Sequence, residues 1–361
     1  MPTMPVDARP DDPLSREMQL LLVAAAADRE RAARAWASWL DAVDIEDLED
    51  GATALLSLVR RNVVDLQAEP SIEGRVRGVH RQTWARNQLL WSAGAPLVDR
   101  LAEVAGVPLL LPPTALLPAY DGDWGARPLE RIQVALHPES VEPVRDALAA
   151  TGWAVDHVTP SLLARTRAGL VERWQSQDPA GNWVSIRWHV LRGVRSSVAD
   201  EQLHGAAVPA VVGSSRVHLL HPADALVERL WNSAGDPTPG WVADAVQLAR
   251  RLDGDGRDGD AIERVARRAR ALGVLPAVRD RLALVAATVP DAAVLAVLDA
   301  LGATRPSLAS ALWTLPEPVA RRGRVWAGHA AGQGVVRGGR SLVRARWASR
   351  QLTKRGSAQR R

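Results

Sequence analysis

The hydrophobic period changes in the middle of the chain, and this change constrains the fold more than any other feature. Residues 131–136 alternate strictly, with Ile132 and Val134 on one side and polar or small residues between them. Period two is typical of a strand with one buried face. The flanking regions 14–105 and 221–318 instead place apolar residues at helical spacing. We therefore expect an α+β fold, with a sheet between two helical blocks.

Further short segments fit this division. A long helix is expected from about Gly74 to Leu101, interrupted near Gly94-Ala95-Pro96. The central region predicts strands at 107–111, 131–136 and 153–158, helices at 114–119 and 138–149, a loop at 120–125, and a hairpin over 169–190 that turns at 178–182. The expected organisation is a disordered start at 1–13, N-terminal helices at 14–105, an α/β core at 106–220, a helical bundle at 221–318 and a basic tail at 319–361.

Several segments of the core also occur in a distinctive order. They are Leu111-Pro112-Pro113, Arg127-Pro128-Leu129-Glu130-Arg131-Ile132-Gln133-Val134-Ala135-Leu136, Gly152-Trp153, Val184-Ser185-Ile186-Arg187-Trp188, His221-Pro222-Ala223-Asp224 and Trp241-Val242-Ala243-Asp244. This order resembles the uncharacterised bacterial nucleotidyltransferase family, in which the second segment reads roughly R-P-x-x-D-x-D-L-L-V. The resemblance covers about residues 75–300 and rests on order and spacing. It implies a nucleotidyltransferase-like mixed sheet with helices before and after it.

The same resemblance implies that the catalytic site is degenerate. The family holds magnesium with carboxylates, and those positions correspond to Arg131, Gln133 and Ser185 here. Magnesium requires oxygen ligands, whereas arginine offers no acceptor and the Gln and Ser side chains are neutral. We therefore expect no metal site and no cofactor. The expected role is binding, scaffolding or regulation, with a nucleotide or another anion as the ligand.

Three alternatives remain at this stage. Arg127, Arg131 and Arg187 are candidates for a metal-free anion site, because guanidinium groups bind phosphate through paired hydrogen bonds. Asp121, Asp123 and Glu130 are candidates for substitute acids, in which case the protein is an active Mg-dependent nucleotidyltransferase. Alternatively, Arg131 and Gln133 form the solvent face of an edge strand in a different fold. His189 shares their expected face, where a structural or solvated role is the default.

The charge of the chain is strongly uneven. Residues 319–361 carry eleven Arg, one Lys and no acidic residue, although the whole chain has a net charge of only +4. Such a tail suits an anionic membrane surface, a nucleic acid or the acidic body of another copy, and a solvated tail is the simplest interpretation. A chain without cysteine, secretory signal or apolar stretch of about 20 residues is expected to be cytoplasmic.

Overall fold

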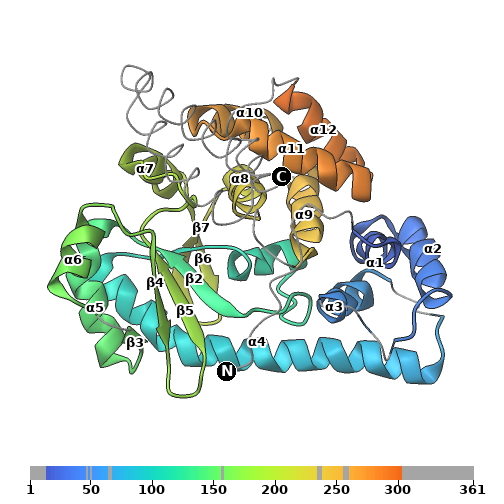
Figure 1. Ribbon diagram of the computed structural model, residues 1–361, viewed down its shortest axis with the longest axis horizontal. Helices are drawn as coiled ribbons and strands as arrows, with labels where there is room; N and C mark the ends of the chain where they lie inside the picture. Colours follow the sequence, from blue (N-terminus) through green and yellow to red (C-terminus); the bar gives the residue numbers. More distant parts are fainter. Residues whose placement is uncertain are drawn as a thin grey trace, which may run out of the picture.

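A computed structural model of the chain describes residues 14–45, 48, 51–63, 67–155, 158–233, 238–254 and 260–302. These residues form a mixed α/β molecule in which helices surround one sheet (Figure 1). The expectation of strands between two helical blocks is thereby confirmed. The segment 1–13 and the basic tail 319–361, for which disorder and anion binding were predicted, lie outside the described residues.

The chain begins with three short helices whose starts follow local capping signals. Ser15 accepts a hydrogen bond from the Met18 amide at 3.1 Å, and Asp28 accepts one from the Arg31 amide at 3.0 Å. Each side chain satisfies an amide that has no partner in the first helical turn. The helices are α1 (Arg16–Ala26), α2 (Arg29–Leu40) and α3 (Ala52–Asn62).

The predicted interruption near Pro96 is wrong. Helix α4 (Pro70–Ala105) runs for 36 residues without a break and lies along the sheet (Figure 1). Gly94 explains part of this, because a Cβ atom there would lie 2.3 Å from Cδ1 of Ile132. Glycine is therefore required for close helix–sheet packing rather than for a turn. The proline removes one backbone hydrogen bond, and the packed apolar side of the helix offsets that loss.

Substituting Gly94 tests this packing. Gly94→Ala is expected to lower the free energy of unfolding by about 1–2 kcal/mol, because overpacking outweighs the better helix propensity of alanine. In the Gly94→Ala background, Ile132→Val should cost less than it does alone, since it removes the methyl group that the new Cβ meets. Urea unfolding of all four proteins gives the coupling energy. Strictly additive costs would contradict the close approach.

The sheet contains seven strands within the described part of the chain. They are β1 (Leu109–Leu110), β2 (Arg131–Ala135), β3 (Ala154–Val155), β4 (Arg173–Gln177), β5 (Trp183–Arg187), β6 (Val208–Val212) and β7 (Ser215–Leu219). Their order is β3-β4-β5-β2-β1-β7-β6. Strand β2 pairs parallel with β5 and antiparallel with β1, and β1 pairs parallel with β7. The other three pairs are antiparallel, so the sheet is mixed.

Short helices connect these strands and cover their ends. The predicted helices at 114–119 and 138–149 are confirmed, the first as a 3-10 helix, whereas α6, α7 and the β6–β7 hairpin were not anticipated. The connecting elements are η1 (Thr114–Tyr120), η2 (Pro138–Ser140), α5 (Val141–Ala150), α6 (Pro160–Arg167) and α7 (Ser197–Gly205).

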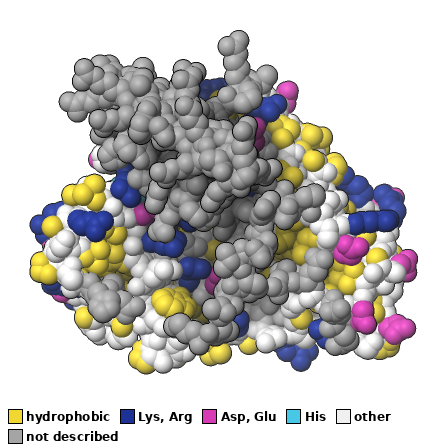
Figure 2. All heavy atoms as spheres, viewed as in Figure 1, with side chains coloured by type: hydrophobic (Ala, Val, Ile, Leu, Met, Phe, Trp, Pro, Cys, Tyr) yellow, Lys and Arg dark blue, Asp and Glu magenta, His cyan; other side chains and the backbone are white. Residues whose placement is uncertain are grey.

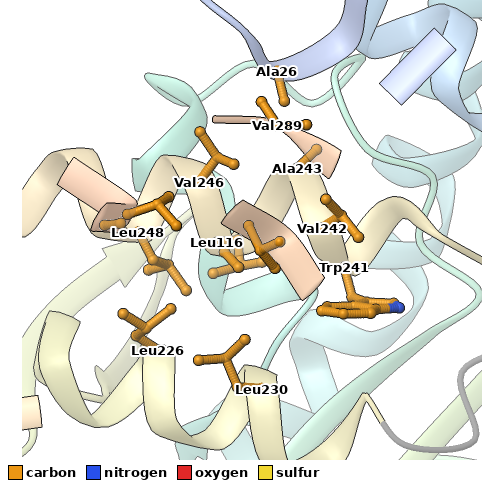
Figure 3. Close-up of a cluster of buried hydrophobic side chains, with 14 of the residues drawn as sticks. Ala26, Leu116, Leu226, Leu230, Trp241, Val242, Ala243, Val246, Leu248 and Val289 are labelled. Atoms are coloured by element: carbon orange, nitrogen blue, oxygen red, sulfur yellow. The ribbon is translucent and has the colours of Figure 1, made fainter. Parts of the chain in front are cut away.

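The C-terminal helices share a core with the N-terminal ones. They are α8 (Pro222–Asn232), α9 (Gly240–Gly254), α10 (Ala261–Ala271), α11 (Leu275–Thr288) and α12 (Ala292–Leu301). Figure 3 shows their apolar side chains together with those of η1 and α1, including Leu226, Leu230, Val242, Val246, Leu116 and Ala26. The two helical blocks that frame the sheet in the sequence therefore pack against each other in space.

The described surface is mixed in charge. Figure 2 shows basic side chains on the visible part of this face, and both acidic and basic side chains at the end formed by α2 and the start of α4. Within the described residues, no helix is both long and apolar enough to cross a membrane.

Candidate functional site

The pairing of β2, β4 and β5 gives the sheet one apolar and one polar face. Ile132, Val134, Val184 and Ile186 lie in a single buried cluster together with side chains of α4 and α5. Because side chains alternate along a strand, the residues between them belong to the opposite face. We call this opposite side the polar sheet face; its polar members are Arg131, Gln133, Arg173, Gln175, Gln177, Ser185 and Arg187, and Ala135 and Trp183 also lie on it.

Arg131, Gln133 and Ser185, the three positions that the family resemblance singled out, lie together on the polar sheet face. Gln133 of β2 pairs directly with Ser185 of β5, and Arg131 precedes Gln133 by two residues. The Gln133 amide donates to the carbonyl of Pro112 at 3.0 Å, and Arg131 donates to Glu130 at 3.1 Å. The edge-strand alternative is wrong, because β2 has β5 on one side and β1 on the other. Arg131 remains one-third exposed, which leaves its guanidinium within reach of solvent.

Arg187 is the last residue of β5 and lies at that end of the polar sheet face. Its guanidinium is almost fully buried, 3.7 Å from Glu228 of α8 and 3.9 Å from Glu172. Both distances exceed a hydrogen bond, and among the residues that the structure describes neither Nη2 of Arg187 nor Oε2 of Glu228 has a hydrogen-bond partner. Burial raises the pKa of Glu228, although nearby Arg187 acts to lower it. Burial also lowers the pKa of Arg187, so both charges are costly here.

Arg127 belongs to a separate buried network. Its Nε and Nη2 atoms each lie 3.0 Å from the carboxylate of Asp244, which is fully buried in α9. Asp244 also accepts from the Tyr120 hydroxyl at 2.6 Å and from Arg229 of α8 at 2.9 Å. One carboxylate thus joins η1, the approach to β2, α8 and α9. The network fixes where the chain enters β2.

The three arginines therefore occupy different environments. Arg131 pairs across from Trp183, so Arg187 lies four residues further along the paired strands. At about 3.3 Å per residue this is a separation of roughly 13 Å along the strands. Arg127 and Arg187 are both held against buried carboxylates, whereas Arg131 has only the exposed Glu130. Of the three arginines proposed to bind an anion, Arg131 has the most accessible guanidinium.

The candidate substitute acids each have partners within the protein. Asp121 forms an ion pair with Arg61 of α3. Asp123 uses one carboxylate oxygen for His80 at 3.0 Å and the other for the Gly125 amide at 2.8 Å. Among the described residues, no group of three or more His, Asp or Glu side chains is arranged to hold a metal ion. The loop acids act here as links between the loop and helices α3 and α4.

Two buried networks of aspartate and arginine side chains were not predicted from the sequence. Besides Asp244, the fully buried Asp224 of α8 accepts hydrogen bonds from Arg264 and Arg268 of α10. A signal was present, because each aspartate sits within an apolar helical run, Ala223 to Val227 and Val242 to Val246. A buried carboxylate requires a charged partner, so such a pattern predicts a buried ion pair. The identity of the partner cannot be inferred from local sequence.

Compared with models of protein families, with curated proteins and with solved structures, the chain gives no match.

Proposed function

We propose that this chain is a nucleotidyltransferase-like protein that no longer carries out metal-dependent transfer and acts instead by binding an anionic ligand at the polar sheet face. The alignment of Arg131, Gln133 and Ser185 on one face of two parallel, adjacent strands carries the proposal. Alternate side chains of a strand point to the same face of the sheet. Carboxylates at such positions on two adjacent strands could therefore bind one metal ion together. Here these positions present a cation, an amide and a hydroxyl instead.

Electrostatics favours anion binding over metal binding at these positions. A unit charge 4 Å from a divalent cation is repelled by about 8 kcal/mol at an effective dielectric of 20. Solvent screening reduces this value for Arg131, whose side chain is one-third exposed. The sign of the interaction remains unfavourable for magnesium and favourable for phosphate. An arginine also supplies paired donors that match phosphate oxygens.

The neighbouring groups support a direct role for Arg131. Its partner Glu130 is 72% exposed, and exposed ion pairs contribute only about 0–1 kcal/mol, so a phosphate can replace it. The side-chain amide of Gln133 donates a hydrogen bond to the Pro112 carbonyl, and this bond holds the Gln133 side chain in place. Arg187 lies further along the same face, beside Glu228 and Glu172, and Arg127 positions the start of β2. The protein's role in this proposal is binding, scaffolding or regulation in the cytoplasm.

Calorimetric titration of the full chain with ATP tests the proposal. We expect ATP to bind with EDTA present, and Arg131→Ala to weaken binding about tenfold, the loss of one charge-assisted contact. Arg145→Ala is the matched control, because Arg145 is an exposed arginine of α5 that forms a similar surface pair with Asp146. Absence of binding, or binding only with magnesium, would count against the proposal. Magnesium-dependent turnover of ATP would favour the active-enzyme alternative with Asp121, Asp123 and Glu130.

A further inference from the structure

A second polar site lies beyond the end of the polar sheet face. A cavity of about 340 Å³ opens at the C-terminal ends of β2 and β5, between η2, the end of α6 and the start of α7. His137 and His189 line it; His137 lies two residues after Ala135, the last residue of β2, and His189 two residues after Arg187, the last residue of β5. Cavities above about 300 Å³ are large enough for small-molecule ligands.

The floor of the cavity is a buried, hydrogen-bonded histidine–aspartate pair. Nδ1 of His189 lies 2.7 Å from Oδ2 of Asp200, and Oδ1 of Asp200 accepts from the Val190 amide at 2.9 Å. Nε2 of His189 faces the carbonyl oxygen of Gly169 at 3.1 Å. Both carboxylate oxygens and both ring nitrogens therefore have protein partners. This pair shapes the cavity, and its polar atoms are already engaged within the protein.

Three charged side chains around the cavity differ from that pair. Arg195, in the loop before α7, has a buried Nε atom that finds no hydrogen-bond partner in the described segments of the chain. Glu139 and Glu201 are exposed at the rim. Within the described part of the chain, none of the three forms an ion pair, whereas Arg167 on the wall pairs with Glu142 of α5. The cavity thus presents one unmatched guanidinium and two unmatched carboxylates.

We infer that this cavity binds a small zwitterion of the amino-acid type, with its carboxylate on Arg195 and its ammonium group between Glu139 and Glu201. A simple anion gains one favourable contact and meets two carboxylates of its own sign. A simple amine is attracted by the two carboxylates but repelled by the guanidinium of Arg195, which is the least exposed of the three side chains. Only a ligand with both charges matches all of them, and the cavity volume accommodates a free amino acid.

The inference is independent of the polar sheet face. None of its three ligand-binding residues belongs to that face, and its ligand differs from ATP in charge and size. Loss of ATP binding in the Arg131→Ala variant and loss of amino-acid binding in an Arg195 variant are separate results. Either proposal can therefore fail while the other stands.

Titration of the full chain with the free L-amino acids tests the inference. At least one is expected to bind saturably, whereas its N-acetyl derivative and its amide, which lack the ammonium and carboxylate charges, bind at least tenfold more weakly. Inorganic phosphate serves as the simple anion. Absence of saturable binding by every amino acid at millimolar concentration would overturn the inference, as would equal affinity for phosphate or for the N-acetyl derivative.

Two variants and a control locate the site. Arg195→Ala is expected to weaken amino-acid binding at least tenfold, and Glu201→Gln several-fold, because each removes one charge contact. Arg165→Ala is the matched control, since Arg165 is an exposed arginine of α6 that does not line the cavity. All three side chains are at least partly exposed, so the thermal unfolding midpoint should change little. Unchanged affinity in Arg195→Ala would exclude this cavity as the binding site.

Discussion

Replacing Asp244 with asparagine is expected to lower the free energy of unfolding by about 3–5 kcal/mol, the usual cost of breaking a buried ion pair from one side. The carboxylate is shared by Arg127, Arg229 and the Tyr120 hydroxyl, and it is fully buried. The substitution keeps the shape of the side chain and removes the charge on which two guanidinium groups depend. Urea unfolding followed by tryptophan fluorescence measures the loss.

The matched control is Asp146→Asn, at an exposed aspartate that pairs with Arg145 on the surface of α5. It should change stability by less than about 1 kcal/mol, because exposed pairs contribute little. Equal effects at both positions would contradict the structural role of Asp244. A small effect at both would mean that water screens the network.

The same network predicts an acid-sensitive contribution to stability. Burial acts to raise the pKa of Asp244, but Arg127 and Arg229 outweigh it and hold the pKa below its usual value. Burial also raises the pKa of Tyr120, so its hydroxyl remains a donor to Asp244. A lowered folded-state pKa stabilises the protein above the unfolded-state pKa of about 3.9. That contribution is lost as the pH falls through the folded-state value.

Stability is also expected to fall between pH 6.5 and pH 4 because of His204. Burial, together with the neighbouring His137, lowers the pKa of His204 from 6.5 to about 4. The two imidazole rings lie 4.3 Å apart between centroids. The folded state therefore resists protonation that the unfolded chain accepts. The contribution is fully present above pH 6.5 and disappears as the pH falls towards 4, a loss of roughly 3 kcal/mol.

Two measurements check the histidine prediction. Between pH 6.5 and pH 4 the free energy of unfolding should fall further for wild type than for His204→Asn, because the variant lacks the titrating ring. NMR titration of the imidazole signals should show one ring with a midpoint near 4, and that signal should be missing from His204→Asn. In His137→Asn the midpoint should rise, since one repelling neighbour is gone. A midpoint near the ordinary value of 6.5 would contradict burial of the ring.

Strands β1 to β5 and most helices followed from local sequence because their signals are local. The alternation at Ile132 and Val134 predicted β2, and the helical spacing of apolar residues after 221 predicted the C-terminal helices that begin with α8. The break expected at Pro96 failed because the packing of Gly94 against Ile132 is a long-range contact. Local composition around Gly94 gives no information about the strand that lies beside it. Helices α6 and α7 are short, with weak periodicity, and were missed for that reason.

The candidate site was predictable as a face but not as a set of contacts. The spacing of Arg131 and Gln133 placed both side chains on one side of a strand, and the resemblance named Ser185 as the third position, which the structure shows directly opposite Gln133. The burial of Arg187 against Glu228 could not be foreseen, because the two residues come from a strand and a distant helix. The metal-free anion site remains a prediction.

The sequence by itself determined where helical and strand periodicity alternate and that one face of β2 and β5 is polar. It also determined that Arg131, Gln133 and Ser185 supply no carboxylate to that face. These properties depend on residue type and spacing along a single element. Only the tertiary structure decided that β2 is a central strand, that Asp244 joins two arginines, and that Arg195 lines a cavity with Glu139 and Glu201. Each of these depends on side chains that are remote in sequence, and their approach is set by the packing of whole elements rather than by local preference.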